Sequence, residues 1–270
     1  MVSRRYYRQQ YERRYICNEC YHRYHYWDVT PCPVNIATYN KIGSKRKYGV
    51  EIETSRCDNY QRLAGKTIFG AKRDGSIDGI EFVSPILYGD EGLNYVTELC
   101  DYGRDNDWTA NNSCGLHIHI DVRNESDDEL KNIAAAYAKT YDVWKKFVAS
   151  RRVHCNWCNP HRWTLSDLDG YHDFLSFSYD QDRYYWFNVA AYSRHKTFEV
   201  RFMEGTVDDE KINNWIIAHT RFTDLAARTD RHTLTNMRSV TAQWEFVSQA
   251  LGSLKSVYEP MLATAQPAYV

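Results

Sequence analysis

Gly115-Leu116-His117-Ile118-His119-Ile120-Asp121 alternates apolar and ionisable side chains over one short run. Because residues two apart in a β-strand lie on the same face, this run predicts a strand with an apolar side and a charged side. Three more segments follow the pattern: Gly49-Val50-Glu51-Ile52-Glu53, Phe198-Glu199-Val200-Arg201-Phe202 and, more loosely, Asp74-Gly75-Ser76 with Glu81-Phe82-Val83. Charged groups are costly to gather unless something compensates them, so the shared face predicts a site for a highly charged ligand.

The wider pattern predicts the fold class. Strand signals occur at 48–54, 80–86, 115–122, 184–191 and 197–203, and helical spacing lies between them. Parallel strands are usually covered on both faces and form continuous apolar runs, whereas these strands alternate. We therefore expect an α+β protein in which helices cover the apolar face of a curved, mainly antiparallel sheet, leaving the charged face open.

Apolar spacing also places the main helices. Asp127 and Asp128 precede a helix expected to continue to Phe147, and Asp208-Asp209 precede a second helix that extends to Leu225. Further helices are expected at 91–102 and 239–251. The chain then divides into an Arg/Tyr-rich amino-terminal arm at 1–46, a core at 47–232 and a helical extension at 233–270 that packs on the core.

Composition excludes several classes of protein. The 270 residues include 22 Tyr and 8 Trp, which argues against disorder, and Lys+Arg 34 balances Asp+Glu 35. The whole-protein charge therefore gives no reason to expect nucleic-acid binding, and the arginines of the arm are expected to pack on a partner or on the chain itself. No apolar run approaches the roughly 20 residues that span a bilayer, so we expect a cytoplasmic protein without membrane contact.

The residues of the charged face suggest metal chemistry. Glu51 and Glu53 share one strand face, a spacing suited to Mg²⁺ or Mn²⁺, although a solvent-facing strand edge would look the same. His117 and His119 are candidates for metal or phosphate contacts, or for half-buried histidines bonded to neighbouring strands. Three other segments carry open alternatives: Glu199 and Arg201 as an ordinary ion pair or a metal and phosphate site, Asp74-Gly75-Ser76 as a simple turn, and Glu81 as a third metal carboxylate.

Eight cysteines in a chain without an export signal favour thiols or metal ligands over disulfides. Two CxxC pairs, Cys17 with Cys20 and Cys155 with Cys158, could complete one structural zinc site that ties the arm to the core. Alternatively, the first pair binds zinc locally, or Cys155 and Cys158 are packing residues. A redox dithiol is less favoured, because no thioredoxin-like βαβ pattern surrounds either pair.

Six motifs carry a family resemblance: YGVEIE, RDGSIDGIEFVSPIL, NNSCGLHIHIDV, VASRRVHCNW, FNVAAY and KTFEVRFMEGTVDDEKINNWI. Their order over residues 47–230 resembles the amidoligase family, relatives of glutamine synthetase and glutamate–cysteine ligase. The resemblance implies a glutamine synthetase catalytic-domain-like fold and ATP-dependent joining of a carboxylate to an amine, with Mg²⁺ or Mn²⁺ as cofactor. The resemblance implies a carboxylate and an amine as substrates, with peptides, proteins and cell-wall components as open alternatives among which the sequence does not choose.

The resemblance assigns roles residue by residue. It implies metal binding by Glu51, Glu53, Glu81, His117 and Glu199, nucleotide or substrate contacts by Arg201, Arg151, Arg152 and Ser76, and a general base among His119, Glu204 and Asp74. Glu53, His119, Arg201 and Asp74 are therefore the expected catalytic residues. The first hypothesis is an ATP-dependent ligase that acts through an acyl phosphate. The alternatives are an inactive scaffold on the same fold and a zinc-stabilised nucleic-acid-binding module.

Overall fold

The computed structural model describes residues 41–63, 65–161 and 163–263. Cys17, Cys20 and nearly all of the expected arm at 1–46 lie outside these residues. None of the helices within the described ranges is long and apolar enough to cross a membrane.

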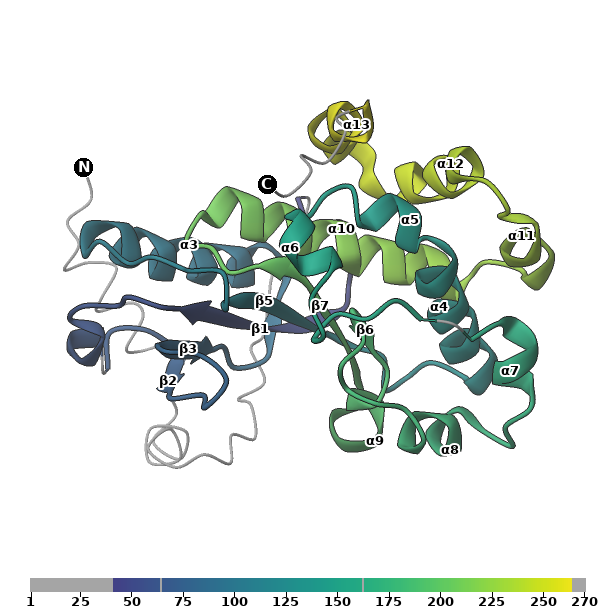
Figure 1. The fold of residues 1–270 in the computed structure, drawn as a ribbon, viewed down its shortest axis with the longest axis horizontal. Helices are drawn as coiled ribbons and strands as arrows, with labels where there is room; N and C mark the ends of the chain where they lie inside the picture. Colours follow the sequence, from purple (N-terminus) through teal and green to yellow (C-terminus); the bar gives the residue numbers. More distant parts are fainter. Residues whose placement is uncertain (1–40, 64, 162, 264–270) are drawn as a thin grey trace.

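One antiparallel sheet forms the centre of the molecule (Figure 1). Its strands are β1 (Lys47–Thr54), β2 (Gly70–Lys72), β3 (Ile80–Val83), β4 (Leu87–Tyr88), β5 (Gly115–Asp121), β6 (Phe187–Asn188) and β7 (Thr197–Glu204). They follow the order β2-β3-β1-β5-β7-β6, and β4 pairs with β1. Every pair is antiparallel, which confirms the α+β class and the antiparallel sheet expected from the sequence.

Alternation of residue types divides the two faces of the sheet. Val50, Ile118 and Val200 are almost fully buried on the apolar face of β1, β5 and β7. Glu51, His117, His119, Glu199 and Arg201 occupy the intervening positions of the same strands. The period of two therefore places the apolar residues in the core and the charged residues together on the opposite face.

The helices flank both sides of this sheet. They are α3 (Gly89–Asp105), α4 (Asp127–Lys139), α5 (Tyr141–Trp144), α6 (Ser150–Val153), α7 (Leu165–Asp169), α8 (Phe174–Tyr179), α9 (Ala191–His195), α10 (Asp209–Ala227), α11 (Arg231–Asn236), α12 (Val240–Leu251) and α13 (Lys255–Ala263). The long α3 and α10 lie side by side over one face, where α10 also contacts β5 (Figure 1). The short α8 and α9 lie on the other side near β6, so the charged face is walled rather than fully open.

Three local expectations need correction. Ser126, not Asp127 or Asp128, caps α4: its side chain accepts from the Glu129 amide, and Glu129 bonds back to the Ser126 amide. That helix ends at Lys139, and Thr140, whose hydroxyl donates to the Ala136 carbonyl, separates it from α5. The strand expected at 184–191 is only Phe187–Asn188, since the chain soon afterwards enters α9.

The carboxy-terminal helices share the core of the sheet. Phe246 of α12 packs its ring 5.6 Å from that of Phe222 in α10, and Tyr258 of α13 lies 4.8 Å from Phe147. One continuous set of buried side chains extends from Ile42 to Tyr258. The boundary expected at 232/233 falls within α11.

Candidate active site on the charged face of the sheet

Strand register brings the charged side chains together. Glu51 of β1 lies opposite His117 of β5, and His119 of β5 lies opposite Glu199 of β7. On the other side of β1, Glu53 lies opposite Glu81 of β3. Antiparallel partners that face the same side have Cβ atoms about 4.5–5.5 Å apart, so this register alone concentrates four carboxylates and two imidazoles.

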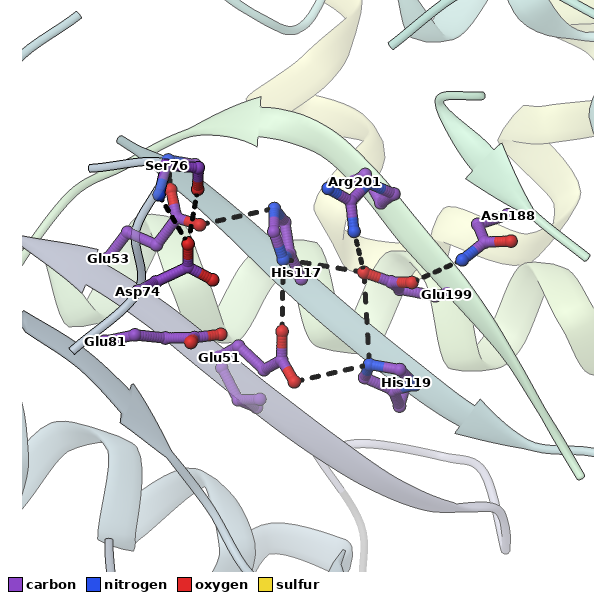
Figure 2. A network of polar contacts seen from close by, with 12 residues as sticks. Glu51, Glu53, Asp74, Ser76, Glu81, His117, His119, Asn188, Glu199 and Arg201 are labelled. Carbon is purple, nitrogen blue, oxygen red and sulfur yellow. Dashed lines mark hydrogen bonds and ion pairs between the residues drawn. The ribbon is translucent and has the colours of Figure 1, made fainter. Parts of the chain in front are cut away.

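Glu51 joins two clusters of potential metal ligands (Figure 2). One consists of Glu51, Glu81 and His117, the other of Glu51, His119 and Glu199, and in each the ligand atoms lie within 4.8 Å of one another. Glu51 Oε2 is 3.1 Å from His117 Nδ1, whereas Glu51 Oε1 is 3.6 Å from His119 Nε2. The two oxygens of one carboxylate thus point into two adjacent sites.

The acidic residues of the first cluster titrate in opposite directions. Burial and then the neighbouring charge of Glu51 raise the pKa of Glu81 to about 8, and the ion pair with Lys72 at 2.8 Å only partly offsets this. Burial also opposes ionisation of Glu51, but hydrogen bonds with His117 and His119 outweigh it and hold the pKa well below its usual value. At neutral pH, Glu51 is therefore ionised whereas Glu81 retains its proton for the most part.

Glu199 is held firmly at the centre of the second cluster. Its Oε1 accepts from Arg201 Nη1 at 2.5 Å and its Oε2 accepts from Asn188 Nδ2 at 2.6 Å. Burial would raise the pKa of Glu199, but the charges of His119, Arg201 and His117 lower it. Burial would lower the pKa of His119, and the carboxylates of Glu199 and Glu51 raise it. The sequence missed Asn188, although the segment FNVAAY contains it.

Glu53 occupies a different position from Glu51. Its Oε2 accepts from the Gly115 amide at 2.5 Å, and its Oε1 lies 3.9 Å from His117 Nε2. Within the described ranges, neither of the two close clusters includes it. Glu53 therefore anchors the start of β5 and lies beside the His117 imidazole, at the border of the first cluster.

A cavity of about 710 Å³ opens over these residues. Cationic side chains from several elements line it together with the acidic clusters: Lys72, Arg151, Arg152, Arg183, Arg194 and Arg201. Sequence reasoning missed Lys72, Arg183 and Arg194, and it also missed His195, whose ring lies 6.1 Å from that of His119. Lys72 lies on the three-residue strand β2, and the other three residues lie on a loop and on the short helix α9, segments too brief to carry a periodic signal.

Of the two neighbouring arginines Arg151 and Arg152, Arg152 is the more buried. It is only 4% exposed, and its Nη2 donates to the Arg201 carbonyl oxygen at 2.5 Å. Among the described residues, the buried Nε atoms of Arg151, Arg152 and Arg201 have no hydrogen-bond partner. Unsatisfied buried donors are costly, so these guanidinium groups are suited to an anionic ligand in the cavity.

Asp74 and Ser76 form the turn that their composition predicted and also line the cavity. Asp74 Oδ1 accepts from both the amide and the hydroxyl of Ser76 at 2.7 Å. These two bonds lower the pKa of Asp74. A carboxylate stabilised in this way is a weak proton acceptor.

Glu204 lies at the end of β7, opposite Gly115 of β5. A β-bulge between Val200 and Met203 breaks the two-residue alternation of β7, so counting from Glu199 and Arg201 does not give the face of Glu204. Its Oε2 accepts from the Ala149 amide at 2.9 Å, and its Oε1 pairs with Lys211. Glu204 does not line the cavity; it holds the amino-terminal end of α6, which carries Arg151 and Arg152.

Cys155 and Cys158 follow α6 directly. Cys155 lines the cavity, whereas Cys158 is fully buried beneath it. A hydrogen bond from Cys158 lowers the pKa of Cys155 to about 6. The other half of the expected zinc site, Cys17 and Cys20, lies outside the described residues.

Comparison with known proteins agrees with the motifs. A family model described as "Putative amidoligase enzyme" matches residues 57–223, more than half of the chain. Its range contains Glu81, His117, His119, Glu199 and Arg201 but begins after Glu51 and Glu53.

No curated protein matches the chain. A solved structure described as "Crystal structure of novel glutamine synthase homolog" is similar, with 11% sequence identity and a TM-score of 0.44, over 83% of this chain and 68% of that chain. A likeness at this level carries no argument about the site. The family model, in contrast, matches more than half of the chain, and the chain therefore belongs to the amidoligase family that the model describes.

Proposed function

We propose that the protein is an ATP-dependent carboxylate–amine ligase, which forms an amide or peptide-like bond through an acyl phosphate. The observation that carries the proposal is the pair of carboxylate–imidazole clusters sharing Glu51, in a cavity also lined by buried arginines. Membership of the amidoligase family supports it. An inactive scaffold would have no need to keep such costly charges together.

The donor set fits divalent ions. Carboxylate oxygens suit Mg²⁺ or Mn²⁺, and the imidazole nitrogens add affinity for Mn²⁺. Burial and, after it, the charge of Glu51 raise the pKa of Glu81, and a cation bound beside both carboxylates would stabilise their ionised forms. Glu51, Glu81 and His117 would hold one ion, and Glu51, His119 and Glu199 a second, with Glu53 beside His117. When bound, such ions offset the negative charge that develops during phosphoryl transfer.

The arginines suit the phosphate groups of the nucleotide. Glu199 fixes Arg201, and among the described residues the buried Nε atoms of Arg201 and Arg152 have no hydrogen-bond partner. Arg151 in α6 and Ser76 in the turn before β3 also line the cavity. Preorganised donors of this kind stabilise charge without reorganising during the reaction.

His119 can accept a proton from the attacking amine through Nε2 only when that atom does not bind the second ion. Its Nδ1 is bonded to Thr197 Oγ1 at 3.0 Å, which fixes the ring, and Glu199 and Glu51 stabilise its protonated form. Asp74 binds protons less readily and Glu204 does not reach the cavity. The substrates would be a carboxylate and an amine, with peptides or proteins among the classes to test.

The decisive experiment measures calorimetric binding of a non-hydrolysable ATP analogue with and without Mg²⁺. Wild type should bind the analogue only when Mg²⁺ is present. Glu51→Gln/Glu53→Gln should remain folded but no longer show this metal-dependent binding. Glu245→Gln/Glu259→Gln, with both carboxylates exposed on α12 and α13, is the matched control and should bind like wild type. Absence of binding to folded wild type would remove the ligase proposal and favour a scaffold, whereas salt-sensitive oligonucleotide binding that requires residues 1–46 would favour the nucleic-acid alternative.

A further inference from the structure

The Cys155-Asn156-Trp157-Cys158 segment forms a tight turn at the wall of the cavity. The Cys158 amide donates to the Cys155 carbonyl at 3.4 Å, which closes the turn. An interaction between the two side chains lowers the pKa of Cys155 and raises that of Cys158. Two thiols in contact, one of them open to a cavity, have the arrangement needed for reversible disulfide formation.

Each thiol is also bonded to the backbone of a residue in the candidate active site. Cys155 Sγ donates to the Arg152 carbonyl at 3.3 Å, and Cys158 Sγ donates to the Arg201 carbonyl at 3.1 Å. Cys57, Cys100 and Cys114, the other cysteines of the described ranges, do not line the cavity. The Cys155–Cys158 pair thus differs from them in two ways: Cys155 lines the cavity, and its side chain interacts with that of a second cysteine.

We propose that Cys155 and Cys158 form a thiol–disulfide exchange site that reacts with small-molecule disulfides entering the cavity. Cys155 is the attacking thiol because it lines the cavity, and Cys158 is the resolving thiol because it lies buried behind it. This inference does not depend on the ligase activity.

The exchange is balanced in two steps. The Cys155 sulfur, after losing its proton, attacks one sulfur of the small disulfide, which forms a mixed disulfide and releases one small thiolate. Cys158 then loses its proton and attacks the Cys155 sulfur, which forms the Cys155–Cys158 bond and expels the second small thiolate. The two protons reside on the released thiols, so the protein dithiol is oxidised and the small disulfide is reduced.

Oxidation would change a contact of the candidate active site. Cys158 would lose the S–H that donates to the Arg201 carbonyl, and Arg152 Nη2 would remain as a donor to that oxygen. The disulfide would lie immediately behind the segment of β7 that presents Glu199 and Arg201. Reaction with small disulfides would therefore change the side of the cavity where Arg152 and Arg201 are proposed to contact the nucleotide.

The experiment treats reduced full-length protein with oxidised glutathione, then quenches, alkylates and maps the tryptic peptide 153–162, which contains both cysteines. Wild type should yield this peptide lighter by two hydrogen atoms and without alkylation. Cys158→Ser should stop at glutathione attached to Cys155, and Cys155→Ser should yield no disulfide in this peptide. Cys57→Ser is the matched control, since Cys57 is a half-buried thiol away from the cavity, and it should behave like wild type.

Three results would overturn the proposal. Complete alkylation of both cysteines in treated wild type would show that the pair does not exchange. Oxidation that requires prior removal of zinc by a chelator would assign the pair to a metal site instead. A disulfide that joins either residue to Cys17 or Cys20 would assign it to a different bridge. If a serine variant fails to fold, the wild-type peptide alone still decides among these results.

Discussion

Glu51 faces His117 across β1 and β5, and its two carboxylate oxygens reach two imidazoles, 3.1 Å from His117 Nδ1 and 3.6 Å from His119 Nε2 (Figure 2). One side chain therefore links both candidate metal clusters. Any ion bound by one cluster would alter the charge available to the other, so the affinity of each site is expected to depend on whether the other is filled.

Replacing Arg201 tests the proposed phosphate contact. Arg201→Ala should weaken binding of the Mg²⁺–ATP analogue about 10- to 100-fold, because a charge-assisted contact is lost and Glu199 is left without its partner. Arg201→Lys should retain part of the affinity, since the charge remains without the planar fork. Calorimetric titration measures both.

Arg123→Ala is the control for that series, because Arg123 is exposed, pairs with Asp121 and does not line the cavity. It should bind like wild type. If Arg201→Ala unfolds the protein, or if it binds like the control, Arg201 serves as an ordinary ion-pair partner.

The raised pKa of Glu81 predicts that the free energy of unfolding of the metal-free protein depends on pH. This pKa is about 8 in the folded protein against 4.5 ordinarily, so the folded state keeps a proton that the unfolded state releases. The contribution to the free energy of unfolding is therefore full below pH 4.5 and is lost as pH rises toward 8, by about 2–5 kcal/mol. Relative to Glu81→Gln, wild type should lose stability over this window.

Denaturant unfolding of both proteins at several pH values, in a chelating buffer, measures the difference. The lowered pKa of Glu51 acts with the opposite sign, but its window lies below pH 4.5 and does not overlap. Parallel profiles for wild type and Glu81→Gln between pH 4.5 and 8 would show that Glu81 titrates normally.

Gly115 is required by close packing between β5 and Arg152. A Cβ at this position would lie 2.9 Å from Arg152 Nη2 and 3.0 Å from His117 Nε2. Gly115→Ala should therefore displace Arg152, cost about 1–3 kcal/mol of stability and weaken analogue binding. Gly75→Ala, where a Cβ would meet nothing within 4 Å, is the control. Equal thermal stability and affinity of the two variants would contradict this account.

Glu204 separates a positioning role from a catalytic one. Glu204→Ala removes the acceptor for the Ala149 amide and should destabilise the protein by about 1–3 kcal/mol, whereas Glu204→Gln retains an acceptor and should keep analogue binding. Glu210→Ala, at an exposed position in the first turn of α10, should leave both quantities unchanged. Should Glu204→Gln bind the analogue normally yet show no ATP turnover with an active substrate pair, Glu204 acts in the chemistry.

Strand faces were the part of the fold that local sequence predicted well. The alternation in β1, β5 and β7 placed Glu51, His117 and Glu199 on a common face, because the period of a strand is set by backbone geometry alone. Helix positions followed from apolar spacing. The break at Thr140 did not, because both sides of the break keep apolar residues in helical register with the core.

Contacts between distant segments were beyond local patterns. Lys72 pairs with Glu81 and Asn188 with Glu199 because loops return those residues to neighbouring strands, and Ala149 reaches Glu204 because α6 begins beside β7. A β-bulge between Leu116 and Ile118 also shifts the pairing of β5 with β7. Single-strand periodicity contains no information on such register.

By itself, the sequence determined an α+β protein with an antiparallel sheet, an apolar face and a charged face, and the motifs of the amidoligase family. Those features depend on the backbone period and on the order of residues, and both are local properties of the chain. Tertiary structure decided that Glu51 joins two clusters, that Glu53 anchors the Gly115 amide and that Cys155 opens into the same cavity. Distances of a few ångströms between side chains depend on strand register, loop return and burial, and these arise only when the whole core packs.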